Sequence, residues 1–233
     1  MSVHLPNLSF WEHQWLKNAD IVVVGSGIVG LQCARQLKLQ WPRREVWVID
    51  RAPVSLGAST RNAGFACFGS MGEILDDINR TDESAALALY EKRYKGLQLL
   101  LQDYGNTAVG YEKTGGYEIF RPGDEAELEQ IANNLDHINA GLKSVSGENS
   151  FMVKSTAKLG MRVLEKGIYT PLEGALQSHL LYKRITDATI SAGVRIFGGL
   201  TALPPQPMDN GRWRVSSEEG YVFDAQTLVV CTN

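Results

Sequence analysis

The chain has 233 residues, of which 44% are hydrophobic and 21% are charged, and its formal net charge is -3. This balance is that of a globular protein with a sizeable core, and the slightly acidic charge gives no indication of a nucleic-acid-binding surface. Neither a targeting segment nor an apolar run of membrane-spanning length is recognisable, so no membrane association is expected. The three cysteines follow neither a metal-binding nor a disulfide spacing, which favours reduced thiols and a cytoplasmic location.

The strongest signal lies between Asp20 and Asp50, in DIVVVGSGIVGLQCARQLKLQWPRREVWVID. The order of residue types predicts a buried strand, a glycine-rich turn, a helix and a second strand. Gly25, Gly27 and Gly30 form the G-x-G-x-x-G pattern. The first glycine allows a tight turn, the second lets a pyrophosphate approach the backbone, and the third lets helix and strand pack closely. The motif therefore predicts a dinucleotide-binding unit.

The helix expected over residues 28–39 begins at this turn, so its free N–H groups and positive dipole end are available to phosphates. Asp50 ends the second strand 20 residues after Gly30. A carboxylate there accepts the hydroxyls of an adenosine ribose and would repel the 2′-phosphate of NADP. These observations do not separate NAD from FAD. The cofactor residues predicted from the motif are Gly25, Ser26, Gly27, Ile28, Gly30, Asp50 and Arg51.

The next segment, APVSLGASTRNAGFACFGS over residues 52–70, favours FAD. A nicotinamide-binding unit would proceed at once to another helix, whereas small and hydroxyl residues here let a flat ligand lie close to the main chain. The alternative, an irregular surface loop, predicts more charge and fewer Phe and Ala residues. We expect two hydroxyls and an arginine to bind phosphate, and the following backbone to line a ring edge, in the order Ser59, Thr60, Arg61, Asn62, Ala63, Gly64 and Phe65.

The chain resembles the D-amino-acid oxidase/glycine oxidase family of FAD-dependent oxidoreductases over most of its length, in VVVGSGIVGL, VIDRAPVSLGASTRNAGF, GIYTPLEGAL and TLVVCTN. The resemblance implies that the glycine motif holds the FAD pyrophosphate, Asp50 the adenosine ribose, and Ser59 to Gly64 the pyrophosphate, ribityl chain and flavin ring. It also implies that Ala202 lies near the adenine and Thr232 where the last strand meets the cofactor. Members that tether flavin in this segment use a His, and none occurs between His13 and His137, so non-covalent FAD is implied.

The predicted fold class is α/β, a Rossmann-like FAD-binding domain with a mainly parallel sheet, interrupted by a partial α+β substrate domain. The FAD-binding domain is expected at residues 1–80 and 160–233, and the substrate domain at residues 81–159. Ser70 and Glu73 form a capping box that opens a short helix. In the substrate domain we expect a helix with a core-facing aromatic stripe over 81–104, two short strands around Gly115-Gly116, and one amphipathic helix from Leu128 to Ile138 ended by Gly141. Further along the chain we expect a helix over 175–191, a parallel strand over 193–197, an antiparallel ribbon over 212–225 and a buried strand over 228–231.

A full-length member of the family is expected to oxidise the C–N bond of an amino acid or secondary amine by hydride transfer to flavin, with the backbone of Asn62 to Phe65 near the reacting edge. An NAD-dependent dehydrogenase and a non-catalytic nucleotide-binding module are the alternatives. Cys67 near that edge is interpreted as a small buried hydrophobe rather than a redox group.

The resemblance further predicts that this chain is a C-terminally truncated portion that binds FAD weakly or not at all and turns over no amine. An exposed apolar surface that permits self-association is expected as a consequence.

Overall fold

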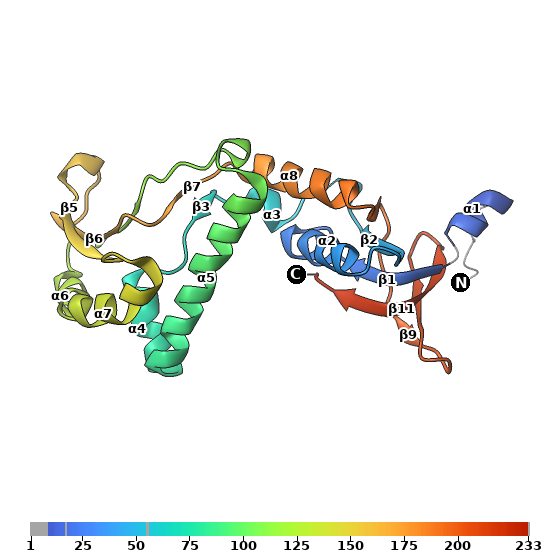
Figure 1. Cartoon of the computed structure of the whole chain (residues 1–233). Helices are drawn as coiled ribbons and strands as arrows, with labels where there is room; N and C mark the ends of the chain where they lie inside the picture. Colours follow the sequence, from blue (N-terminus) through green and yellow to red (C-terminus); the bar gives the residue numbers. More distant parts are fainter. Residues whose placement is uncertain (1–8, 17, 55, 233) are drawn as a thin grey trace. The chain divides into compact units, whose positions relative to one another are not determined.

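The computed structural model describes residues 9–16, 18–54 and 56–232, and Figure 1 shows its helices and strands along the chain. The chain forms two compact units, one made of residues 1–62 and 178–233 and the other of residues 63–177. These boundaries differ from the expected ones at residues 80 and 160. The reason is local pairing inside the second unit, where β3 (Phe65–Ala66) is antiparallel to β7 (Gly174–Ala175).

The first unit is built on a six-stranded sheet in the order β8-β2-β1-β11-β10-β9. The neighbours among the first four strands are parallel, and β10 and β9 complete the sheet in antiparallel pairing. The α/β fold with a mainly parallel sheet is therefore confirmed, as is the return of the C-terminal strands to the first sheet. The strands are β1 (Asn18–Val24), β2 (Val46–Asp50), β8 (Arg195–Gly198), β9 (Gln206–Pro207), β10 (Trp213–Ser216) and β11 (Val222–Val230).

The centre of this sheet is buried because its strands are runs of β-branched residues. Val22 and Val23 of β1 and Val48 of β2 have no exposed surface, as expected for a strand covered on both faces. Helix α2 (Ile28–Gln40) packs on β1 and β2 and against α8 (Ser178–Ser191). Val22 belongs to a core cluster around Trp47, whose ring meets those of Phe197 and Phe223 edge-on. The unit also contains the short helices α1 (Phe10–Trp15) and α3 (Ala58–Arg61).

The last part of β11 is less enclosed than the sequence predicts. Strand β1 accompanies β11 from Asp224 to Val230, but β10 pairs only with Val222 to Ala225. Within the described residues, Thr227 to Val230 therefore has β1 as its one strand neighbour. Val230 is 63% exposed, and the prediction of a buried strand over residues 228–231 is wrong for this reason.

The second unit is a small α+β assembly around an aromatic core. Tyr90 of the long helix is buried, its ring edge-on to Phe68 at a centroid distance of 5.1 Å. The predicted core role of the aromatic stripe is confirmed, because Tyr94 and Leu97 also pack against this cluster. The elements are α4 (Met71–Arg80), α5 (Glu83–Tyr104), α6 (Glu125–Asn133), α7 (Leu135–Ser146), the 3-10 turns η1 (Thr107–Val109) and η2 (Ala157–Leu159), and an antiparallel sheet of β4 (Gly116–Glu118), β6 (Lys166–Thr170) and β5 (Met152–Ser155) in that order.

Two local predictions in this unit are wrong. Of the two short strands expected around Gly115-Gly116, in a stretch that the structure describes throughout, only β4 forms, and it pairs with the distant β6, while Glu112 makes an isolated bridge to Ala175. The single helix expected to end at Gly141 is two helices, α6 and α7, and α7 runs through Gly141 to Gly147. A Cβ at residue 141 would lie 2.7 Å from Cδ1 of Leu87. Helices α5 and α7 therefore approach each other closely at Gly141.

The capping box is confirmed, because the Ser70 hydroxyl accepts from Glu73 N–H while the Glu73 carboxylate accepts from Ser70 N–H. Helix α8 begins at Ser178 rather than at residue 175, since Ala175 belongs to β7.

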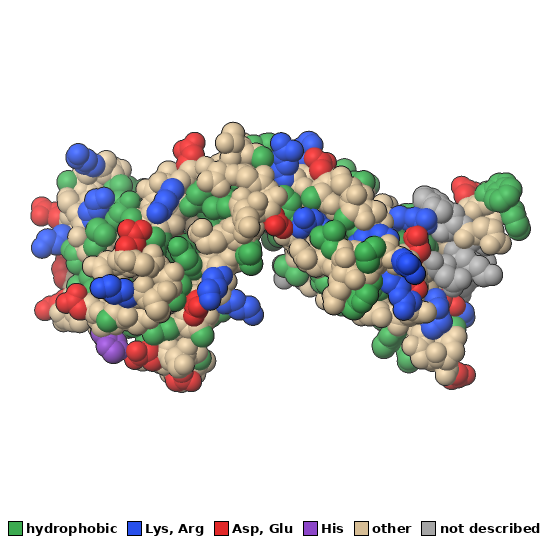
Figure 2. Space-filling model, in the orientation of Figure 1, with side chains coloured by type: hydrophobic (Ala, Val, Ile, Leu, Met, Phe, Trp, Pro, Cys, Tyr) green, Lys and Arg blue, Asp and Glu red, His purple; other side chains and the backbone are tan. Residues whose placement is uncertain are grey.

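Figure 2 shows hydrophobic side chains interspersed with charged ones over the face in view. Large apolar side chains such as Leu99 on α5 and Val153 on β5 are exposed, while self-association through them stays a prediction. No helix in the described part of the chain is long and apolar enough to cross a membrane. Nor do residues 9–16, 18–54 and 56–232 contain a group of three or more His, Cys, Asp or Glu side chains placed to hold a metal.

Candidate cofactor site

The first and third motif glycines are required by the lack of space at the end of β1. Gly25 has φ 110°, and a Cβ there would lie 2.7 Å from the carbonyl oxygen of Cys231. A Cβ on Gly30 would overlap the carbonyl oxygen of Gly25. At Gly27 the backbone conformation is an ordinary extended one, and a Cβ would come within 3.2 Å of the Ser59 hydroxyl. The first and third glycines are thus needed by the fold itself, whereas Gly27 keeps the start of α2 accessible.

Asp50 is tied to the glycine-rich turn. Its Oδ2 accepts hydrogen bonds from the backbone N–H of Ser26 at 2.7 Å and from the Ser26 hydroxyl at 2.9 Å. Its Oδ1 accepts from Ala52 N–H at 3.0 Å. Burial raises the pKa of Asp50, but these hydrogen bonds and the Arg51 charge outweigh it and hold the pKa below its usual value. The carboxylate is therefore ionised at neutral pH, with remaining lone pairs available to ribose hydroxyls.

The first turn of α2 faces Ser59. The Ser59 hydroxyl accepts a hydrogen bond from Ile28 N–H at 3.0 Å. The N–H groups of a first helical turn have no partner within the helix, and they attract anions together with the helix dipole. Ser59 therefore already supplies one oxygen at the place where the sequence predicts phosphate oxygens.

The segment that carries Ser59 forms the short helix α3 and is fixed at its end. The Asn62 side-chain amide donates to the carbonyls of Ala58 and Ser59, both at 3.1 Å, and its Oδ1 accepts from the Ser178 hydroxyl at 2.6 Å. Thr60 lies in α3, and the hydroxyl that was expected to bind phosphate donates to Gly57 O at 3.3 Å. Arg51 and Arg61 are both exposed.

The other predicted residues are distributed over both units. Ala63, Gly64 and Phe65 belong to the second unit, where Gly64 O accepts from Leu176 N–H at 2.8 Å and the Phe65 ring is 77% exposed. In the first unit, Thr232 is exposed just after β11. Ala202 is half-buried, bridges to Ser217 and packs in the cluster around Trp47. The contacts of all these residues with FAD stay predictions.

Sequence reasoning missed the groups that hold the glycine-rich turn from outside the motif. The Tyr182 hydroxyl on α8 donates to Ser26 O at 3.1 Å, across 156 residues of sequence. No spacing rule could have found this contact, because it depends on how α8 returns to α2.

Two carboxylates of the second unit, also missed, hold the segment that follows Phe65. Oε1 of Glu173 accepts from Phe68 N–H at 3.0 Å, and Oε1 of Glu118 accepts from the Ser70 hydroxyl at 2.9 Å. Burial raises the pKa of both Glu118 and Glu173, and neighbouring carboxylates raise it further. The hydrogen bonds that these carboxylates accept lower the pKa, but by less.

Cys67 is not the buried hydrophobe that the sequence suggested, because its side chain is exposed. Partial burial, followed by the charges of Glu173 and Glu73, raises the pKa of its thiol. A raised pKa keeps the thiol protonated at neutral pH, which argues against a reactive thiolate.

A parallel sheet with a glycine-rich turn, a following helix and an acid at the end of the next strand defines a dinucleotide-binding unit. The family described as FAD dependent oxidoreductase matches residues 20–233, and the chain belongs to this family. FAD is the cofactor of the family, so the prediction of FAD rather than NAD is confirmed.

Individual relatives match 90–94% of this chain but only part of their own length. The chain is 25% identical to the probable oxidoreductase OrdL of Haemophilus influenzae over 223 residues, which are 94% of this chain and 49% of that protein. Glycine oxidase from Geobacillus kaustophilus has a similar fold, with a TM-score of 0.64 and 16% identity over 93% of this chain and 55% of that one. Iminodiacetate oxidase from Chelativorans sp. gives a TM-score of 0.63 and 20% identity, over 90% and 54%. The chain thus spans about half the length of these relatives.

Proposed function

We propose that the first unit binds the AMP half of FAD, non-covalently, in an oxidoreductase that acts on an amino acid or amine. The arrangement that carries the proposal is the turn from Gly25 to Gly30 with Asp50 hydrogen-bonded to Ser26. Family membership supports FAD as the dinucleotide, and the names of the similar structures, glycine oxidase and iminodiacetate oxidase, support an amine or amino acid as the substrate.

The residues at hand account for binding rather than for chemistry. The N–H groups at the start of α2, together with Ser59, would hold the pyrophosphate, and the ionised Asp50 would hold the ribose. Bound FAD supplies the electron acceptor for oxidation of a C–N bond. The backbone from Asn62 to Phe65 would orient the flavin ring, because Asn62 is fixed by its bonds to Ala58, Ser59 and Ser178.

A second candidate function is nucleotide binding without turnover by these 233 residues alone. Their relatives are about twice as long, so whatever the other half of each relative contributes is not carried here. We therefore expect these 233 residues to bind FAD more weakly than a full-length relative does, and to show no steady amine oxidation.

The test combines a binding and a turnover measurement on the 233-residue chain. FAD titration followed by flavin fluorescence should show saturable binding, and a panel of amino acids and secondary amines should give no flavin reduction. Asp50→Asn should weaken FAD binding about tenfold, because an amide offers one acceptor oxygen where the carboxylate offers two. Asp209→Asn, on an exposed residue of the same unit, is the matched control and should bind as the parent. Failure to bind FAD would overturn the proposal, and steady turnover would overturn the second candidate function.

A further inference from the structure

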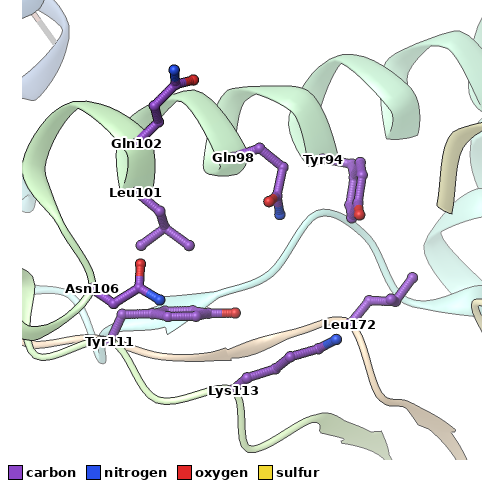
Figure 3. A pocket seen from close by; sticks show the side chains of 8 residues that line it. All are labelled: Tyr94, Gln98, Leu101, Gln102, Asn106, Tyr111, Lys113 and Leu172. Carbon is purple, nitrogen blue, oxygen red and sulfur yellow. The ribbon is translucent and has the colours of Figure 1, made fainter.

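A cavity of about 530 Å³ lies within the second unit. Its walls are the C-terminal half of α5 and the chain from Asn106 to Lys113, with Leu172 at one end (Figure 3). Cavities of this size hold small molecules in other proteins. None of the residues that line the cavity is among those that the sequence assigned to FAD.

One part of the lining is apolar. Leu172 is 4% exposed and belongs to the unit's core cluster. Leu101 lines the cavity from α5, and in Figure 3 it points toward the Tyr111 ring, which lies along the facing segment. A flat or branched apolar body would bury its surface against the side chains of Leu172, Leu101 and Tyr111, and the removal of that surface from water favours binding.

The charge of the lining has one sign. Lys113 is the one ionised side chain among the lining residues, and no carboxylate is among them. The ammonium of Lys113 lies 3.9 Å from Glu148 Oε1, with both side chains more than half exposed. An exposed ion pair of that length is weak, so Lys113 remains available to a bound anion.

Neutral donors surround the same space. The side-chain amides of Gln98 and Asn106 line it, and in Figure 3 both reach from their backbones toward the Tyr111 side. Burial raises the pKa of the Tyr111 phenol, and the charges of Tyr94 and Glu173 raise it further. The phenol therefore keeps its proton and can donate a hydrogen bond to an anionic oxygen.

We propose that this cavity binds a small carboxylate that carries an apolar or aromatic body and no ammonium group. The carboxylate meets Lys113 and the surrounding donors, and the body packs on Leu101, Leu172 and the Tyr111 ring. A cationic amine finds no carboxylate in the lining and meets the charge of Lys113 instead. The ligand class therefore differs from that of the amine or amino acid proposed as substrate, and the site does not depend on FAD.

Isothermal titration of the 233-residue chain with phenylacetate tests the proposal, with phenylacetamide and phenethylamine as the neutral and cationic counterparts. Saturable millimolar binding of phenylacetate is expected, with the amide about tenfold weaker and the amine not bound. Lys113→Met should weaken phenylacetate binding about tenfold, and Lys113→Arg should preserve it. Lys92→Met, an exposed lysine on α5 outside the lining, is the matched control and should have no effect.

Gln98→Glu offers an independent variant, because it places a carboxylate in the lining without removing Lys113. It should also weaken phenylacetate binding, while circular dichroism shows that each variant keeps its helices. Absence of phenylacetate binding, or equal affinities for phenylacetate and phenylacetamide, would overturn the proposal. So would unchanged binding in Lys113→Met. The FAD titration of the same samples is a separate readout, so a failure here is distinguishable from a failure of the FAD proposal.

Discussion

Replacing Gly27 by alanine should separate the fold of the glycine-rich turn from its function. Gly27 has an ordinary extended backbone conformation, so alanine brings no φ strain. The new Cβ would stand 3.2 Å from the Ser59 hydroxyl, in the space where a phosphate must approach α2. Alanine is a poorer N-cap than glycine, and it would disturb the hydrogen bond between Ser59 and Ile28. Together these changes should lower the free energy of unfolding by about 1 kcal/mol.

The cost for FAD should be larger than the cost for the fold. A hydrogen bond from a backbone N–H to a charged phosphate is worth about 1.5–3 kcal/mol, and 1.4 kcal/mol is a factor of ten in affinity. Losing one such bond therefore weakens FAD binding about 10–100-fold, while the melting temperature falls only about 2–4 °C. Fluorescence titration and thermal unfolding measure the two effects on one sample. Gly57→Ala, where a Cβ meets nothing within 4 Å, is the control. FAD affinity that survives Gly27→Ala would refute the placement of the pyrophosphate.

Three further predictions concern the fold and its titratable groups. Gly30→Ala should destabilise the first unit by about 3 kcal/mol, because the new Cβ would overlap the carbonyl oxygen of Gly25. The effect is measured as a lower urea midpoint or as insoluble protein. A midpoint equal to that of the parent would contradict the close packing of α2. Glu118 and Glu173 have raised pKa values in the folded chain, so the stability they contribute is full below their unfolded pKa and is lost as pH rises through the folded pKa. Glu173→Gln should flatten this decline in urea midpoints measured from acidic to neutral pH. An unchanged slope would show that the pKa of Glu173 is the same in the folded and unfolded chains. Cys67 is exposed and the pKa of its thiol is raised. An aromatic disulfide reagent should therefore modify Cys67 faster and faster as the pH rises well past neutrality. A modification rate that has already reached its plateau at neutral pH would instead indicate a thiolate.

The parts of the fold that the sequence predicts correctly depend on local rules. The β-branched run of β1 and the glycine spacing before α2 each fix a conformation within a few residues, and both lie where expected. The capping box at Ser70 is local in the same way. The return of the C-terminal strands to the first sheet followed from the rules for crossover connections, whereas the order of the strands in that sheet was not predicted.

The parts that the sequence does not predict depend on distant partners. Gly141 looks like a helix end, but the constraint on it comes from Leu87 of another helix. The residues on either side of the glycine pair 115–116 look like two short strands, but in this fully described stretch only β4 forms, and its partner β6 lies about 50 residues later. In the candidate site, the sequence predicts that Asp50 binds a ribose, but it does not predict the three hydrogen bonds that Asp50 accepts from Ser26 and Ala52. These bonds arise from the path of the glycine-rich turn.

The central claim is that the first unit recognises FAD through its AMP half, and competition at equilibrium tests it most directly. FAD bound to the 233-residue chain is titrated with AMP, with FMN and with NAD, and release is followed by flavin fluorescence. The account predicts that AMP displaces FAD, because both compete for Asp50 and the start of α2, and that FMN does not. Displacement by FMN with no effect of AMP would contradict the account, as would NAD binding tighter than FAD.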